Sequence, residues 1–231
     1  MSVYLAEFVG TAFLILLGDG CVANVILKGT KGNGGGWITI TTGWAVAVFV
    51  PAMIFGSISG ASFNPALTIG LAAAGKFDWA LVPGYVCAQV AGAFVGAFLV
   101  WLMYKNHFDE TSDPGTQLGV FSTGPAIRNT GSNLISEIIG TFVLVFTLSV
   151  ANGSSFGGFF VYAVILTIGI SLGGTTGYAI NPARDLGPRI AHAILPMKGK
   201  GSSDWGYAWI PVVGPVIGGI LGAVVGKALL G

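Results

Sequence analysis

Charged side chains are scarce in this sequence of 231 residues. Lys, Arg, Asp and Glu make up 8% of it, against about 25% in a typical soluble domain. So few charges cannot cover a water-facing surface. Hydrophobic residues make up 53%, and the mean hydropathy is +0.81. The composition therefore excludes an ordinary soluble domain and predicts an integral membrane protein. A net charge of +1 gives no reason to expect nucleic acid or an acidic substrate.

Cysteine and histidine are also rare, with two of each. Cys21 and Cys87 lie in apolar runs and are interpreted as reduced core residues, with a disulfide left open. The sequence contains no His-Glu-x-x-His motif, no metal-type Cys or His spacing, and no Ser or Cys beside a credible base. We therefore expect no cofactor, no metal and no enzymatic activity.

Long apolar runs are what the sequence does contain. A transmembrane helix needs about 20 apolar residues, and six runs approach this length, at residues 3–27, 37–58, 79–104, 134–150, 159–176 and 207–230. The start has no basic segment and no cleavage site, so the first run is expected to remain as a helix. A short turn is expected at 152–155.

Two further apolar runs, at residues 65–74 and 182–195, are too short to span. Asn is a preferred helix N-cap, and Pro is favoured at the next position. Non-spanning segments at membrane depth occur only where they are buried or line a watery cavity. We therefore predict two re-entrant half-helices beside a cavity. Each begins with an Asn-Pro-Ala motif, formed by Asn64, Pro65 and Ala66 and by Asn181, Pro182 and Ala183.

The two halves of the chain resemble each other. Residues 6–11 match residues 136–141, and the second Asn-Pro-Ala follows the first at a similar spacing. Each half holds three spans and one half-helix. Because an odd number of spans reverses orientation, we predict one transmembrane domain made of an inverted repeat, with sites near the midplane. The repeats cover about 1–104 and 132–231 and are linked by a loop at 105–131.

These features resemble the major intrinsic proteins, which are the aquaporins and glycerol facilitators. The resemblance covers essentially the whole chain. It implies an all-α membrane protein with six transmembrane helices and two re-entrant half-helices, assembled as a homotetramer in the cell membrane. It also implies that both termini are cytoplasmic. The positive-inside rule points the other way, because this orientation places most Lys and Arg residues of the loops outside.

Other residues resemble the glycerol-conducting branch of that family, namely Asp185, Arg189 and Pro211. The resemblance places the selectivity filter at Trp44, Gly169, Tyr178 and Arg184. Water-selective members usually carry His at the second of these positions, so Gly169 is expected to widen the pore. Trp44 as a lipid-facing aromatic and Arg184 as a membrane-edge anchor are the alternatives. Three departures from the family pattern concern Tyr178, the pair Ser62 and Phe63, and Asp19.

The expected function is passive diffusion of glycerol and other small neutral solutes, including dihydroxyacetone, together with water. Half-helix dipoles and Arg184 are expected to exclude ions and protons. Glu7 and Glu137 are expected to be structural acceptors, with proton coupling as the alternative. A water-selective pore, passage of neutral lactic acid and a coupled secondary transporter remain open. The predicted pore carbonyls are those of Gly60, Ala61, Ser62, Phe63, Thr176, Gly177, Tyr178 and Ala179.

Overall fold

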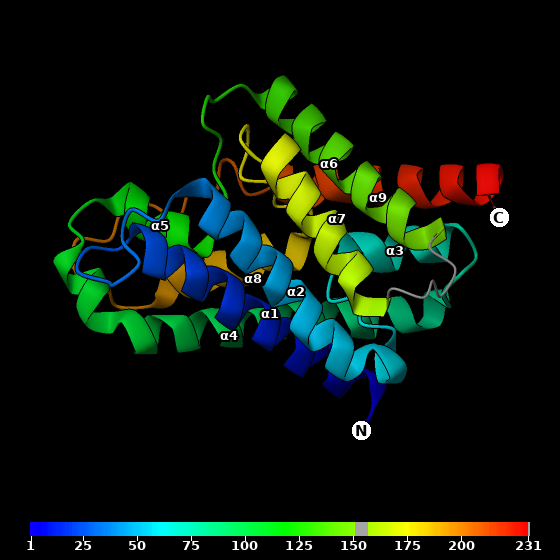
Figure 1. The fold of residues 1–231 in the computed structure, drawn as a ribbon, viewed down its shortest axis with the longest axis horizontal. Helices are drawn as coiled ribbons and strands as arrows, with labels where there is room; N and C mark the ends of the chain where they lie inside the picture. The colour runs from blue at the N-terminus through cyan, green and yellow to red at the C-terminus, as the bar shows by residue number, and fades with distance from the viewer. Residues whose placement is uncertain (151–156, 231) are drawn as a thin grey trace.

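The computed structural model describes residues 1–150 and 157–230, and within them it is all-helical, as predicted. The turn expected at 152–155 lies outside the described residues. The long helices run broadly along one axis of the molecule (Figure 1). The helices are α1 (Val3–Ile26), α2 (Gly36–Ser59), α3 (Pro65–Ala73), the short 3-10 helix η1 (Trp79–Leu81), α4 (Val82–Glu110), α5 (Pro114–Phe121), α6 (Thr130–Val150), α7 (Gly157–Leu172), α8 (Pro182–Ile194) and α9 (Ile210–Leu230).

Five described helices are long and apolar enough to cross a bilayer, namely α1, α2, α4 with η1, α6 and α9. The sixth predicted span corresponds to α7, which has 16 described residues. At about 1.5 Å per residue this helix is about 24 Å long. Its predicted C-terminal end at residue 176 is wrong, because α7 ends at Leu172 and a turn follows.

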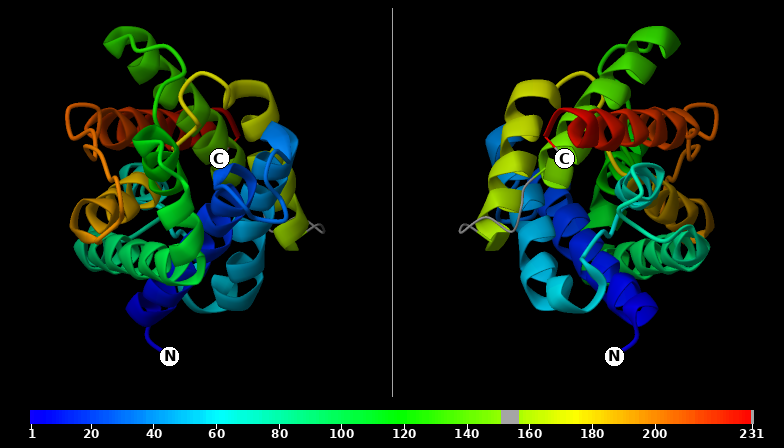
Figure 2. Two further views of the ribbon diagram at one scale, coloured as in Figure 1. Left: turned by 90° about the vertical axis from the view of Figure 1, so that its left-hand side faces the viewer. Right: turned by 90° about the vertical axis from the view of Figure 1, so that its right-hand side faces the viewer.

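Two closely packed helix pairs form opposite sides of the molecule. α1 packs on α4, and α6 packs on α9. The pair α1 and α4 lies in the lower part of the views in Figures 1 and 2, and the pair α6 and α9 lies in the upper part. Small residues permit the approach. A Cβ on Gly92 of α4 would lie 2.1 Å from the carbonyl oxygen of Phe8, and one on Gly218 of α9 would lie 2.3 Å from that of Ile138.

The short helices α3 and α8 connect these pairs. α3 belongs to the first half of the chain but packs mainly on α9 of the second half, whereas α8 of the second half packs mainly on α4. The two helices come from opposite ends of the long axis (Figure 1). Each half of the chain therefore inserts its short helix against the last long helix of the other half.

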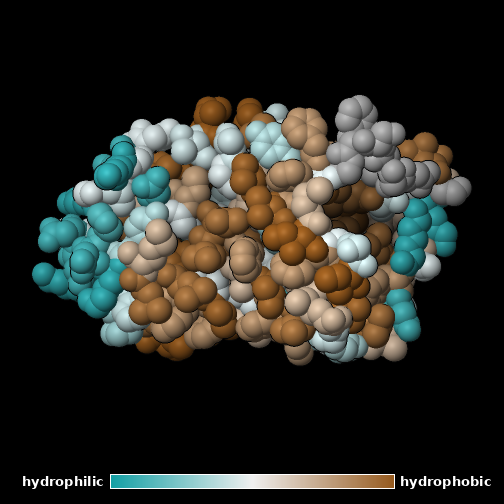
Figure 3. Space-filling view, turned by 60° about the horizontal axis from the view of Figure 1, so that its bottom comes forward, coloured by the Kyte–Doolittle hydropathy of each residue, from teal (hydrophilic) through white to brown (hydrophobic). Residues whose placement is uncertain are grey.

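On the face that Figure 3 shows, the surface is apolar in the middle, and hydrophilic side chains gather toward the ends of the long axis. Large exposed side chains in the spanning helices include Ile54, Leu102, Met103 and Leu221. Such a surface is costly in water and suits the hydrocarbon of a membrane.

The connection at 105–131 is more ordered than the predicted loop. Helix α4 continues to Glu110, and α5 occupies Pro114–Phe121. The start of α5 has a local cause, because the side chain of Asp113 accepts a hydrogen bond from the backbone N–H of Thr116 at 2.7 Å and Pro114 follows at the first helical position. The polar composition of this stretch favoured a loop in the sequence analysis, whereas the structure has a short capped helix there.

Candidate functional site

The two Asn-Pro-Ala motifs begin helices where the sequence predicts. The side-chain oxygen of Asn64 accepts a hydrogen bond from Ala66 N at 2.9 Å, and that of Asn181 accepts one from Ala183 N at 3.0 Å. Both asparagines have extended backbone, and proline occupies the first position of each helix. The capping bond fixes the side chain of each asparagine at the positive end of its own helix.

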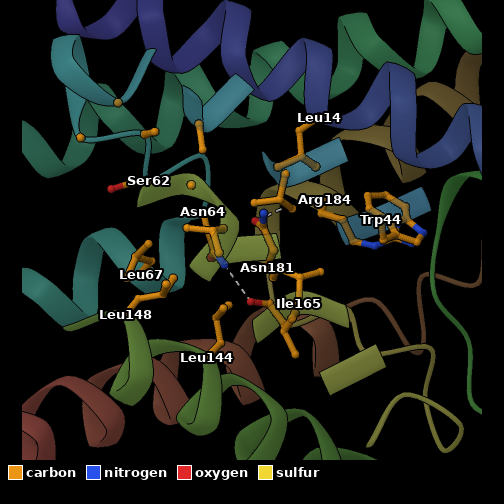
Figure 4. A pocket seen from close by; sticks show the side chains of 18 of the residues that line it. Leu14, Trp44, Ser62, Asn64, Leu67, Leu144, Leu148, Ile165, Asn181 and Arg184 are labelled. Carbon is orange, nitrogen blue, oxygen red and sulfur yellow. Dashed lines mark hydrogen bonds between the residues drawn. The ribbon is translucent and has the colours of Figure 1, made fainter. Parts of the chain in front are cut away.

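These two helix starts meet inside the protein. Asn64 Nδ2 donates to the carbonyl oxygen of Ile180 at 2.8 Å, and Asn181 Nδ2 donates to that of Phe63 at 2.8 Å. Figure 4 shows Asn64 and Asn181 side by side. Each amide uses one N–H in this reciprocal contact and keeps its second N–H available.

The segments before both helices have an unusual backbone. Ala61, Phe63, Tyr178 and Ile180 all have positive φ, between 39° and 50°. This left-handed region costs a non-glycine residue about 1–2 kcal/mol. The conformation persists because surrounding groups hold it, and it re-aims the successive carbonyl groups along each segment.

Glu7 and Glu137 supply that support. The carboxylate of Glu7 accepts hydrogen bonds from Ser62 N at 3.1 Å and from Phe63 N at 2.7 Å. It also accepts from the side chains of Ser59 and Gln89. The carboxylate of Glu7 is buried, and both of its oxygens accept hydrogen bonds from other groups of the protein.

Glu137 repeats the arrangement in the second half. Its carboxylate accepts from Ala179 N at 3.0 Å and Ile180 N at 2.8 Å, and from the hydroxyl of Thr176 at 2.6 Å. The two glutamates therefore hold equivalent strained segments.

A cavity of about 340 Å³ adjoins the meeting point of the two helices. One wall carries the side chains of Asn64, Asn181 and Arg184, as Figure 4 shows. Much of the remaining lining is apolar. Sequence reasoning missed this apolar lining, although the four-residue spacing of Leu144 and Leu148 on one helix face could have indicated it. The apolar lining includes Leu14, Leu67, Leu144, Leu148 and Ile165.

The predicted backbone carbonyls divide into two groups. Gly60, Ala61, Ser62, Tyr178 and Ala179 line the cavity. The other three predicted residues do not. The carbonyl of Phe63 accepts from Asn181, the hydroxyl of Thr176 donates to Glu137, and Gly177 lies against Thr123.

Three of the four predicted filter residues, Trp44, Tyr178 and Arg184, line the cavity, whereas Gly169 does not. A Cβ on Gly169 would lie 2.9 Å from the Tyr178 hydroxyl oxygen, so the ring of Tyr178 fills the space beside this glycine. Gly169 thus has the ring of Tyr178 against its Cα, and the widening expected from this glycine stays a prediction.

Arg184 is held at the cavity wall. Its guanidinium carbon lies 4.0 Å from the centroid of the Trp44 ring, a cation–π contact. Its Nη1 donates to the carbonyl of Phe121 at 3.3 Å and lies 3.6 Å from Asp19 Oδ1. The arginine thus lies at membrane depth between α1, α2 and the end of α5.

Asp185 and Arg189 form a buried ion pair with an N–O distance of 2.8 Å. Asp185 also accepts from the backbone N–H and the hydroxyl of Thr123, at 2.8 and 2.7 Å. Arg189 donates to the carbonyls of Thr123 and Ser203. The pair therefore ties α8 to two connections beside the cavity. Pro211 is buried in the first turn of α9, away from the cavity lining.

The sequence profile of the major intrinsic proteins matches residues 1–225. The chain belongs to the major intrinsic protein family. With its apolar helices, this membership makes it an integral membrane protein with the aquaporin fold. Similar proteins include the probable glycerol uptake facilitator of Thermotoga maritima, which is 59% identical over 93% of this chain and 94% of that protein. The glycerol uptake facilitator of Bacillus subtilis is 52% identical over 93% and 80%, respectively.

A solved structure of this family agrees with the fold. The X-ray structure of the aquaglyceroporin from Plasmodium falciparum is 33% identical and has a TM-score of 0.85. The comparison covers 98% of this chain and 95% of that one. The similarity in fold therefore extends over both halves of the chain and both short helices.

Proposed function

We propose that this chain is a passive channel that carries glycerol and other small neutral solutes, together with water, across the cell membrane. The observation that carries the proposal is the cavity with both polar and apolar lining beside two meeting helix N-termini. Glycerol has hydroxyl groups on a carbon backbone, so it can contact both the polar and the apolar lining of this cavity, which we call the lane. The glycerol facilitators among the similar proteins support the same solute class.

The second amide N–H of Asn64 and of Asn181 donates to a passing hydroxyl oxygen at the midplane. Carbonyls of the lining residues Gly60, Ala61, Ser62, Tyr178 and Ala179 accept from the solute hydroxyls. We assign Phe63 to the support of the lane, because its carbonyl accepts a hydrogen bond from Asn181. The carbonyls of Thr176 and Gly177 stay predicted acceptors.

Trp44 and Tyr178 contact the carbon backbone at the filter, and Arg184 donates to the hydroxyls. The positive helix ends and the guanidinium repel cations and interrupt proton transfer along a water file. The solute exchanges hydration for these contacts and moves down its gradient, so no energy source is required.

Glu7 and Glu137 argue against a coupled transporter. Their oxygens accept hydrogen bonds from backbone and side-chain groups, and neither residue lines the cavity. We assign both to structural support. Among the alternatives within channels, neutral lactic acid is a candidate solute because, like glycerol, it is a three-carbon molecule that carries hydroxyl groups. The other alternative within channels is a water-selective pore.

We also propose that the chain is one domain made of two inverted repeats. Residues 1–104 and 132–231 form two inverted repeats, supported by the matched pairs Asn64 and Asn181, and Glu7 and Glu137. Homotetramers in the cell membrane with cytoplasmic termini follow from the family resemblance. Labelling of a cysteine introduced at Ser2 in intact cells, with native cysteines replaced, tests the orientation.

Stopped-flow light scattering on proteoliposomes tests the function directly. We expect glycerol flux well above that of empty liposomes, with no change when ionophores collapse ion gradients. Parallel runs with water, and with lactic acid at low pH, rank the alternatives. Water flux without glycerol flux, or glycerol flux that requires an ion gradient, would contradict the proposal.

A further inference from the structure

Asp19 is an unusual feature of the first spanning helix. Its side chain is fully buried in α1, and neither carboxylate oxygen accepts a hydrogen bond from any residue that the structure describes. A buried carboxylate without hydrogen bonds is costly at membrane depth. Its one ion-pair neighbour among the described residues is Arg184, with Oδ1 3.6 Å from Nη1.

Arg184 and Asp19 lie at different distances from the cavity. Arg184 lines the cavity and Asp19 does not, so the carboxylate lies behind the guanidinium as seen from the lane. Trp44 covers the guanidinium at 4.0 Å. The ring of Trp44 fits against α1 because residue 18 is glycine, where a Cβ would lie 2.2 Å from a ring carbon. Attraction to Asp19 therefore pulls the guanidinium toward α1 and away from the lane.

The attraction is electrostatic and weakly screened. A separation of 3.6 Å exceeds normal hydrogen-bond length, but the interaction of two charges in a buried site is much stronger than in water. The neighbouring carboxylate of Asp185 is a poor competitor for Arg184, because Arg189 and Thr123 occupy its oxygens.

We propose that Asp19 is a positioning residue of the filter, which holds the Arg184 guanidinium against α1 and thereby keeps the lane open to neutral polyols at and above the size of glycerol. The proposal rests on the proposed channel function and adds a size-determining residue that acts only through Arg184.

Asp19→Asn tests the proposal because it removes the charge and keeps the shape. Released from α1, the guanidinium moves into the lane. The permeability ratio of erythritol, a four-carbon polyol, to glycerol then falls about threefold, a change typical of coupling between contacting residues. Asp19→Val gives the same fall if the asparagine variant folds poorly. Thr11→Val is the matched control, because Thr11 is a buried polar residue of the same helix whose hydroxyl donates to the backbone carbonyl of Glu7, one turn earlier, and it leaves the ratio unchanged.

A double-mutant cycle separates action through Arg184 from general disturbance of α1. In an Arg184→Val background, Asp19→Asn leaves the erythritol-to-glycerol ratio unchanged. An equal fall in both backgrounds, or no fall in either, overturns the proposal. Absence of glycerol flux in the unmodified protein would instead contradict the channel function.

The unfolding temperature in detergent gives a readout that does not depend on conduction. Arg184→Val leaves a buried carboxylate without its counter-charge and lowers this temperature. Adding Asp19→Asn removes that carboxylate and raises the temperature again. A double variant no more stable than Arg184→Val would show that the two side chains are not paired, and would overturn the proposal.

Discussion

The two short helices have the same start and different surroundings. Both begin with a capping asparagine and a proline, and both follow a strained segment held by a buried glutamate. Three residues after the capping asparagine, however, α3 has Leu67 and α8 has Arg184, and both side chains line the cavity. The comparison indicates that the two halves share the capped helix starts, while Arg184 has no charged counterpart at the matching position of α3.

The glutamates test the shared scaffold and carry the largest expected effect. Glu7→Ala and Glu137→Ala each leave several buried donors without an acceptor, beside backbone that is already strained. We expect each to lower the free energy of unfolding by about 3–5 kcal/mol. The measurement is the unfolding temperature and monodisperse yield in detergent.

Glu110→Ala is the control, because this residue is exposed at the end of α4, and it changes little. Since four groups bind Glu7 and three bind Glu137, the loss at Glu7 is at least as large. A small loss at either glutamate would break the proposed equivalence of the two halves.

The filter residues test the difference between the halves. Arg184→Val removes a fixed positive charge from the cavity wall, so we expect proton leak to rise about tenfold, equivalent to about 1.4 kcal/mol in barrier height. Leu67→Val removes only apolar volume at the matching position and leaves the leak unchanged. The measurement is the decay of a pH gradient in proteoliposomes. Equal leak in the two variants would mean that selectivity does not depend on the second half.

Thr123 lies in the connection between α5 and α6 and binds the Asp185 carboxylate of α8. It tests whether this connection stabilises α8. Thr123→Val removes a hydroxyl that donates to the Asp185 carboxylate at 2.7 Å. We expect a loss of about 1–2 kcal/mol, since hydrogen bonds to charged groups contribute about 1.5–3 kcal/mol and Arg189 remains bound to Asp185. Thr175→Val, at an exposed position, is the control. Thermal unfolding of both variants checks this, and equal stability would contradict a supporting role for Thr123.

Local chemistry explains what the sequence could predict. Asn64-Pro65 and Asn181-Pro182 signal helix starts within a few residues, and short apolar runs after them indicate segments that do not span. The family resemblance then supplied Trp44, Tyr178 and Arg184, which do line the cavity. These features depend on neighbours in the chain or on the positions that the family resemblance supplies.

Contacts between distant segments were harder to predict. No local signal shows that Asn64 donates to Ile180, or that the ring of Tyr178 fills the space beside Gly169. The asparagine amide selects its acceptor only after the two halves have packed. For the same reason, Asp19 was recognised in the sequence as a departure from the family pattern, but its position behind Arg184 emerged only from the fold.

Thiol blocking of the lane tests the central claim most directly. With Cys21 and Cys87 replaced by alanine, cysteine is introduced at Val48, which lines the cavity, or at Val46, which is exposed on the outer surface of the same helix. After treatment with a bulky thiol reagent, the account predicts that glycerol flux is lost in the Val48→Cys protein and retained in the Val46→Cys protein. Full glycerol flux through the labelled Val48→Cys protein would show that solutes do not travel through this cavity.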